Sequence, residues 1–231
     1  MFSQMIAEWP EFATYYNLVF LAEAAGTTLA LSALGVILGS LLGLALAVTR
    51  TTRGRLLAPL RGIAFAFTEI FRRVPFLVTL MLAFFVFQMF FANTPLFVVA
   101  AVTTTVIAAA FLAEIIRGGL LSVHRNQWEA AETMNFSRLQ AIRLVILPQA
   151  WRIILPPAFG FFVLFIKDTA LASQIGVVEL TYAGKVLNNK GFSPGLAFGA
   201  ILVIYFMISY PLARLGAALE ARLASSRHHR P

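Results

Sequence analysis

The chain has 231 residues, of which 60% are hydrophobic and 12% are charged, and its net charge is +8. Ordinary soluble domains carry about 25% charged residues, so this composition argues against a soluble enzyme, and the high hydrophobicity excludes a disordered chain. The sequence has no cysteine for a disulfide framework, and two of its three histidines lie in the last four residues, so we expect no metal core. What remains is a protein that crosses a membrane several times.

Long stretches without charge predict where the chain crosses. Residues 24–49, 74–113 and 191–213 contain no Lys, Arg, Asp or Glu. A helix needs about 20 apolar residues to cross the hydrocarbon, so the first and last stretches form one span each. The middle stretch must turn back, and Asn93-Thr94-Pro95 is the place for that turn. A shorter apolar stretch from Ile153 becomes a span if it continues past Lys167. The predicted spans are 24–49, 74–93, 95–116, 153–172 and 193–213.

Basic residues predict which side each connecting segment lies on. With five spans, residues 50–73, 114–152 and the tail from 214 fall on one side and hold 15 Lys and Arg, whereas the other side holds 3. Cytoplasmic loops collect Lys and Arg. We therefore expect the N-terminal segment 1–23 outside, the loop 117–152 inside and the tail 214–231 inside. These arginines border spans instead of forming one basic face, so we expect no nucleic-acid partner.

Small residues in the first span predict close helix packing. Gly35, Gly39 and Gly43 repeat every four residues, which lets two helix backbones approach in lipid. The pattern fits packing on a neighbouring helix or on a partner subunit, and the ordinary frequency of glycine in membrane helices is the alternative.

Two ion pairs are expected at the edges of spans. Glu114 and Arg117 stand three positions apart, where helical side chains meet. Glu69 has the same relation to Arg72 and stands four positions from Arg73. We expect both pairs to be structural.

The cytoplasmic loop 117–152 is too long for a simple connector. Asn126 can cap a helix, with Glu129 three positions later as in a capping box. Asn135 tolerates the left-handed conformation that ends a helix, and a second helix is expected from Ser137 to Leu147, before Pro148. A short helix with small alanines lets another protein approach closely, so the loop is predicted to be a docking element.

This loop resembles the EAA loop of permease subunits of bacterial ABC importers. That pattern is matched by Glu129-Ala130-Ala131 and by Leu147-Pro148, at the family's spacing and without a gap. Asn135 stands at the glycine position and Val145 at the isoleucine position. Asn135 can still adopt a positive φ, at more cost than glycine, so the docking role is expected to survive with a slightly changed geometry.

Other segments are similar to the polar amino-acid permeases of the histidine, glutamine and glutamate group. They are the stretches 111–120, FLAEIIRGGL, 167–173, KDTALAS, and 71–75, FRRVP. The likeness extends over roughly residues 22–220. It implies an all-α membrane protein with five transmembrane helices and the type I ABC importer permease fold, in the inner membrane of a bacterium. With the orientation expected from the basic residues, the N-terminus is then periplasmic and the C-terminus cytoplasmic.

The resemblance also implies partners. A second permease, identical or homologous, would pair with this chain among membrane lipids, and a cytoplasmic ABC ATPase dimer would bind ATP and Mg²⁺ beneath them. A periplasmic solute-binding protein would deliver a polar amino acid. The sequence contains no phosphate-binding loop, so we expect no catalytic residue and no cofactor in this chain. The residues expected to couple to the ATPase are Glu129, Ala130, Ala131, Asn135, Leu147 and Pro148.

A second candidate site lies in the fourth span, where Lys167 and Asp168 are followed by Thr169 and Ser173. Ionisable groups inside a membrane are costly and usually face a cavity or one another. These residues would line the substrate path, although adjacent helix positions face one pocket only if the helix unwinds. In the alternative, Lys167 reaches the outer interface, Asp168 caps the next turn, and the two hydroxyls are ordinary.

Two other functions would require different features in the sequence. A membrane-embedded enzyme would need clustered carboxylates or histidines, and the ten acidic residues are spread singly. A stand-alone secondary carrier or channel is the main alternative, and carriers often show internal repeats, of which none is evident. The permease hypothesis requires an ATPase that copurifies with the chain.

Overall fold

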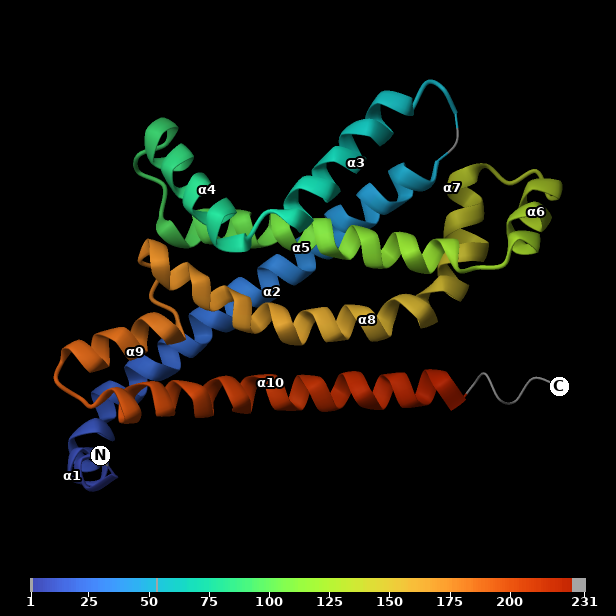
Figure 1. The fold of residues 1–231 in the computed structure, drawn as a ribbon. Coiled ribbons are helices and arrows are strands. Elements are labelled where there is room, and N and C mark those ends of the chain that lie inside the picture. Colours follow the sequence, from blue (N-terminus) through green and yellow to red (C-terminus); the bar gives the residue numbers. More distant parts are fainter. Residues whose placement is uncertain (1, 53, 226–231) are drawn as a thin grey trace.

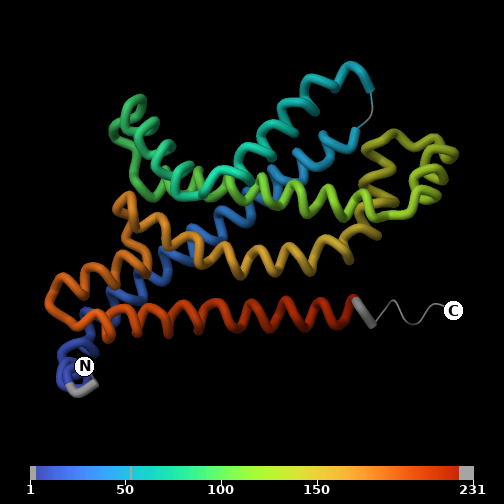
Figure 2. Tube along the Cα trace, viewed as in Figure 1, coloured from blue at the N-terminus to red at the C-terminus, as the bar shows by residue number. Residues whose placement is uncertain are grey.

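The computed structural model describes residues 2–52 and 54–225. Within these ranges the regular structure is entirely helical. The helices α5 (Leu96–Leu121), α8 (Leu147–Asp168) and α10 (Pro194–Ser225) run along one another, and the long α2 (Tyr15–Thr51) crosses them obliquely (Figure 1). The helix α1 (Phe2–Phe12) and the last described turn of α10 lie at opposite ends of this bundle (Figure 2). Arg53, Arg227 and Arg230, which entered the charge count, and the terminal histidines lie outside the described residues.

The described helices account for four or five membrane spans. Four stretches are long and apolar enough to cross a bilayer: Tyr15–Thr51, Leu96–Leu121, Arg138–Ile175 and Pro194–Leu223. A fifth is obtained when α3 (Ala58–Arg73) and α4 (Phe76–Phe90), which are bent by 111° at their junction, are counted as one broken span. The predicted number of five is consistent with this arrangement.

The second span differs from its predicted form. Residues 58–73, expected as part of a connecting loop, form α3, and the predicted span 74–93 contains only the 15-residue α4. Pro75 causes the break, because proline disfavours helical backbone in the residue before it and has no N–H to donate. Val74 is accordingly extended (φ −81°, ψ 134°). A search for uncharged stretches missed α3 because the helix carries Glu69 and several arginines. The turn predicted at Asn93-Thr94-Pro95 is present between α4 and α5.

Several helices extend past the predicted span boundaries. The helix α2 begins at Tyr15, inside the segment assigned to 1–23, and α10 continues to Ser225, through most of the tail from residue 214. Charged residues limit how far a helix can enter hydrocarbon, but they do not end the helix. Two further helices, α1 (Phe2–Phe12) and α9 (Leu180–Asn189), were not predicted.

The glycines of the first span pack against α5 of the same chain. A Cβ added to Gly39 would lie 2.5 Å from the Cβ of Ala108, and one added to Gly43 would lie 3.0 Å from the backbone nitrogen of Ala113. Ala108 and Ala113 are fully buried. The predicted close approach is confirmed, and it joins α2 to α5.

At the end of the bundle where α10 begins, acidic side chains of α1 and of the residue before α9 bind backbone N–H groups. Glu8 accepts a hydrogen bond from the Ser193 N–H at 2.8 Å, which lowers the pKa of Glu8. Glu179 caps α9 by accepting from the N–H groups of Thr181 (2.9 Å) and Tyr182 (2.8 Å), and the Tyr205 hydroxyl donates to it at 2.8 Å. Burial raises the pKa of Glu179.

Candidate functional site

The loop between α5 and α8 folds into a compact unit beyond the end of α5 (Figure 1). It contains α6 (Arg125–Thr133), α7 (Arg138–Ala141) and one π-helical turn, η1 (Ile142–Ile146). The predicted cap at Asn126 is wrong: His124 caps α6, and its Nδ1 accepts from the Asn126 N–H at 3.3 Å. A capping box does occur, but on α7, between Ser137 and Gln140. The Ser-x-x-Gln spacing there was visible in the sequence.

Asn135 ends the first short helix as predicted. Its φ is +59°, the only positive φ among the described non-glycine residues. The following N–H, of Phe136, donates to the Ala131 carbonyl at 3.1 Å and closes the turn. Asn135, which stands at the glycine position of the EAA pattern, therefore adopts the left-handed conformation.

The second helix of the loop does not stop before Pro148. Instead, α7, η1 and α8 follow one another without interruption, and Pro148 lies in the first turn of α8. A proline ring clashes with the carbonyl four residues earlier in a regular helix. The π turn widens the backbone there, and the Leu147 N–H donates to the Ile142 carbonyl, five residues back. The loop and the fourth span consequently form one continuous helical segment.

The two sides of α6 have different surroundings. Ala131 is 1% exposed, and Trp128 packs against the buried cluster that includes Ile142 and Ile146. Glu129, Ala130 and Thr133 are exposed on the other side. Of the two alanines in the Glu-Ala-Ala pattern, only Ala130 is available to a partner, and Ala131 allows the loop to close on itself. Leu147 is half-buried and Pro148 is exposed.

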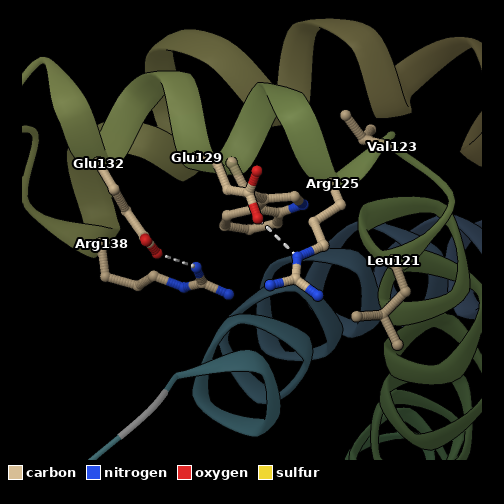
Figure 3. Close-up of a pocket in the computed structure, with 7 residues that line it drawn as sticks. Leu121, Val123, Arg125, Glu129, Glu132 and Arg138 are labelled. Carbon is tan, nitrogen blue, oxygen red and sulfur yellow. Dashed lines mark hydrogen bonds and ion pairs between the residues drawn. The ribbon is translucent and has the colours of Figure 1, made fainter.

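Charged pairs line a groove of about 270 Å³ beneath α6 (Figure 3). Arg125 pairs with Glu129 at 2.6 Å, and Arg138 pairs with Glu132 at 3.6 Å. The Arg138 guanidinium also stacks over the Trp128 ring, 3.7 Å from its centroid. The contacts of Arg138 could not be predicted from the sequence, because its partners on α6 lie across the Asn135 turn, at no helical spacing.

A second cluster of charges joins α2, α3 and α5 near the loop. Both predicted pairs are confirmed: Glu114 binds Arg117, and Glu69 lies 2.6 Å from Arg73 and 3.9 Å from Arg72. Glu114 additionally receives Arg50 at 2.9 Å and Arg72 at 3.8 Å. These contacts between helices could not be predicted from spacing along one helix.

The candidate substrate-path residues separate into two groups. The α-helix ends at Asp168 and continues as a 3₁₀ segment, η2 (Thr169–Ile175), so the backbone changes form just after the charged pair. Lys167 and Asp168 are exposed, whereas Thr169 and Ser173 are buried. The Thr169 hydroxyl donates to the Ile166 carbonyl at 2.7 Å, and Ser173 accepts from the Lys185 ammonium at 3.1 Å.

Lys167 lines a groove of about 410 Å³ between α8 and α10. Tyr205 and Ser209 face it from α10, and the buried Ser209 hydroxyl has no hydrogen-bond partner among the described residues. Neither residue was predicted to be part of a site, although two polar side chains four positions apart in an apolar span indicate a shared helix face. No described group of acidic or histidine side chains could hold a metal ion.

Known proteins resemble this chain over most of its length. The family described as binding-protein-dependent transport system inner membrane component matches residues 35–225. The glutamine transport system permease protein GlnP of Escherichia coli strain K12 is 36% identical over 205 residues, which cover 88% of this chain and 92% of that protein. The L-cystine transport system permease protein TcyB of Bacillus subtilis strain 168 is 34% identical over 197 residues, 85% of this chain and 83% of its own.

Solved structures share the fold. A crystal structure of an amino acid ABC transporter with histidines contains a chain that superposes with a TM-score of 0.79 at 28% identity, covering 91% of this chain and 99% of that one. A chain of the inward-facing MetNI methionine ABC transporter gives a TM-score of 0.76 at 23% identity with the same coverage, which shows the fold alone.

Proposed function

The chain belongs to the family of binding-protein-dependent transport system inner membrane components, and on this premise we propose that it forms the membrane path of an ATP-driven importer of polar amino acids. Relatives named for glutamine and L-cystine transport support that substrate class. These relatives favour the ABC permease over the alternative of a stand-alone carrier or channel.

The exposed side of α6 carries the proposal. Glu129, Ala130 and Thr133 face outward beyond the bundle, while Trp128 and Ala131 anchor the helix to its own chain. A small side chain beside a carboxylate permits close approach and an ion pair with a cleft in another protein. We infer that a separate ATPase dimer, which binds ATP and Mg²⁺, receives this helix from the cytoplasm.

Motion at α6 has a direct route into the membrane. Because α7, η1, α8 and η2 are contiguous, displacement of the loop is carried along one segment to Lys167 and Asp168. ATP-driven closure of the ATPase dimer would tilt this segment and switch the permease between inward-facing and outward-facing states, a two-state transition of packed helices.

Lys167 and Asp168 are proposed to face the substrate path. Charges exposed within a membrane span are costly in lipid, so we place them toward a water-filled path shared with a second permease, identical or homologous. A zwitterionic amino acid offers a partner to each charge. Thr169 and Ser173 are buried, and their role is to hold the 3₁₀ segment η2 in place. The α1 end would then be periplasmic, where a solute-binding protein delivers the substrate.

The test is uptake by the reconstituted complex. The chain, its ATPase and its solute-binding protein are placed in proteoliposomes with glutamine or cystine outside and ATP on the side of α6. We expect ATP-dependent uptake that Asp168→Asn reduces and that Glu23→Gln, an exposed carboxylate on α2, leaves unchanged. Uptake by the chain without an ATPase would contradict the proposal.

Sidedness has a separate test, because the chain has no native cysteine. Single cysteines at Ala92 and at Thr133 are labelled with an impermeant maleimide in intact cells and in inverted vesicles. We expect Ala92→Cys to react from the periplasm and Thr133→Cys from the cytoplasm, and the reverse pattern would overturn the orientation.

A further inference from the structure

Arg138 contacts two parts of the molecule that are far apart in the sequence. Its guanidinium stacks over Trp128 at 3.7 Å and pairs with Glu132 at 3.6 Å, both on α6. It also donates a hydrogen bond to the carbonyl oxygen of Thr51, the last residue of α2, at 3.3 Å. One side chain thus joins the exposed docking helix to the end of the first span.

The chemistry of these contacts suits arginine in particular. The guanidinium is a planar fork that stacks on an aromatic ring while its N–H groups donate in plane. The last carbonyls of a helix lack partners within the helix and carry the negative end of its dipole, so a cation is favoured there. Lysine would keep the charge but would lose the stacked plane and the forked donors.

The end of α2 is a suitable place to receive motion. Arg50, one residue before Thr51, binds Glu114 of α5, and Gly39 and Gly43 of α2 lie directly on the α5 backbone. A shift of the α2 terminus must therefore move α5 with it. This route is distinct from the continuous segment through α7 and α8, which reaches the other side of the bundle.

We propose that Arg138 is a positioning residue that ties the coupling helix α6 to the α2–α5 pair, so that both parts of the bundle follow the ATPase together. The proposal rests on the proposed function, because it concerns how the same docking helix transmits movement. Arg138 contacts neither the substrate nor the nucleotide; it acts through Trp128, Glu132 and the end of α2.

The experiment compares Arg138→Met and Arg138→Lys with Arg152→Met, which removes an exposed arginine from α8. Each variant complex is purified and reconstituted, and four quantities are measured: copurification of the ATPase, melting temperature, ATP hydrolysis and uptake. We expect Arg138→Met to bind the ATPase, melt as the wild type does and hydrolyse ATP, but to import roughly tenfold less amino acid per ATP, a typical coupling effect. Arg138→Lys should lie between, and Arg152→Met should match the wild type.

A double variant tests the contact itself. Trp128→Leu should lower the uptake per ATP, and Trp128→Phe, which keeps a ring for stacking, should restore part of it. Trp128→Leu combined with Arg138→Met should be no worse than Arg138→Met alone, since both remove one link.

The outcomes separate the two proposals. Unchanged uptake per ATP in Arg138→Met overturns the positioning role, as does a loss of ATPase binding or of thermal stability in both Arg138 variants, because either would make Arg138 a part of loop folding or docking. If the wild-type chain neither binds an ATPase nor imports with one, the proposed function itself fails.

Discussion

The two ends of the molecule are held together by different kinds of contact. At the end with α6, side chains from separate helices form ion pairs. The Glu114 carboxylate, for example, has side-chain nitrogens of three arginines within 4 Å, those of Arg50, Arg72 and Arg117. At the opposite end, Glu8 and Glu179 bind backbone N–H groups, and Thr28 of α2 accepts from the Leu180 N–H at 3.2 Å.

We interpret this difference in contacts as a difference in mobility between the two ends. Glu114 keeps Arg50 and Arg117 as partners if α3, which carries Arg72, shifts against the α2–α5 pair, whereas a side chain that caps a backbone fixes one geometry. The ion-pair end also carries the proposed docking helix, so we interpret it as the moving end. The capped end then serves as the fixed base of α1, α9 and α10.

The largest expected effect comes from the close packing of Gly39 and Gly43 of α2 against α5, which connects the two ends. Gly39→Leu would force a side chain into Ala108, where even a Cβ has only 2.5 Å. Overpacking costs typically about 1–3 kcal/mol, and we expect at least the upper value because the α5 backbone lies within the clash. Thermal unfolding of the purified chain measures it. Gly26→Leu is the matched control, since nothing lies within 4 Å of a Cβ there. Equal losses of stability in the two variants would argue against tight packing between α2 and α5.

Next in size is the cap of α9. Glu179→Ala removes a helix cap, worth about 0.5–2 kcal/mol, and leaves the Tyr205 hydroxyl without its carboxylate acceptor, a cost of about 1–3 kcal/mol. We expect a clearly lower melting temperature. The rate of amide hydrogen exchange should rise more in α9 than in the other helices. Glu23→Ala, at an exposed position near the N-terminal end of α2, should change the melting temperature little. If Glu179→Ala changed neither the melting temperature nor the amide exchange of α9, the proposed difference between the two ends would be wrong.

The ion-pair end should lose less from a comparable change. Arg50 has a side chain only 10% exposed, but Glu114 keeps Arg117 when Arg50 is replaced. We expect Arg50→Met to cost about 1–2 kcal/mol, below the 3–5 kcal/mol for a buried charge left unpaired. Arg73→Met is the control because the Arg73 side chain is 78% exposed, and exposed pairs are worth about 0–1 kcal/mol. Denaturant titration of both variants would reveal whether the partners can substitute for one another.

The last comparison concerns the turn after α6, where one of two substitutions is expected to change stability least. Asn135 has φ +59°, a conformation that glycine adopts without a steric penalty. We expect Asn135→Gly to leave stability within about 1 kcal/mol of the wild type and Asn135→Val to cost about 1–2 kcal/mol. If the turn only positions α6, Asn135→Gly should copurify with the ATPase better than Asn135→Val does. Better binding by Asn135→Val would show that the turn has another role.

Much of this architecture could be predicted because lipid imposes simple rules. Uncharged stretches located α2, α4, α5, α8 and α10, and the glycine spacing identified the closely packed face of α2. The left-handed Asn135 and the pairs of Glu114 and Glu69 followed from local backbone and helix geometry. These features depend on residues near one another in the sequence.

The missed features depend on tertiary contacts or on exceptions to a local rule. The helix α3 carries charges, so uncharged stretches cannot predict it. The helix continues through Pro148 because of a π turn, which no sequence pattern predicted. The burial of Ala131 and the stacking of Arg138 on Trp128 arise only when the loop folds back on itself. The Lys167 groove needs α10 beside α8, which the sequence alone does not place there.

The most direct test of the account is a cross-link from the exposed side of α6. A single cysteine at Ala130, carrying a photoactivatable reagent, is compared in the assembled, transporting complex with one at Ala92, in the turn at the other end. The account predicts that Ala130→Cys captures the ATPase subunit and that Ala92→Cys does not. An active complex in which Ala130→Cys captures no ATPase, or in which Ala92→Cys captures it instead, would contradict the account.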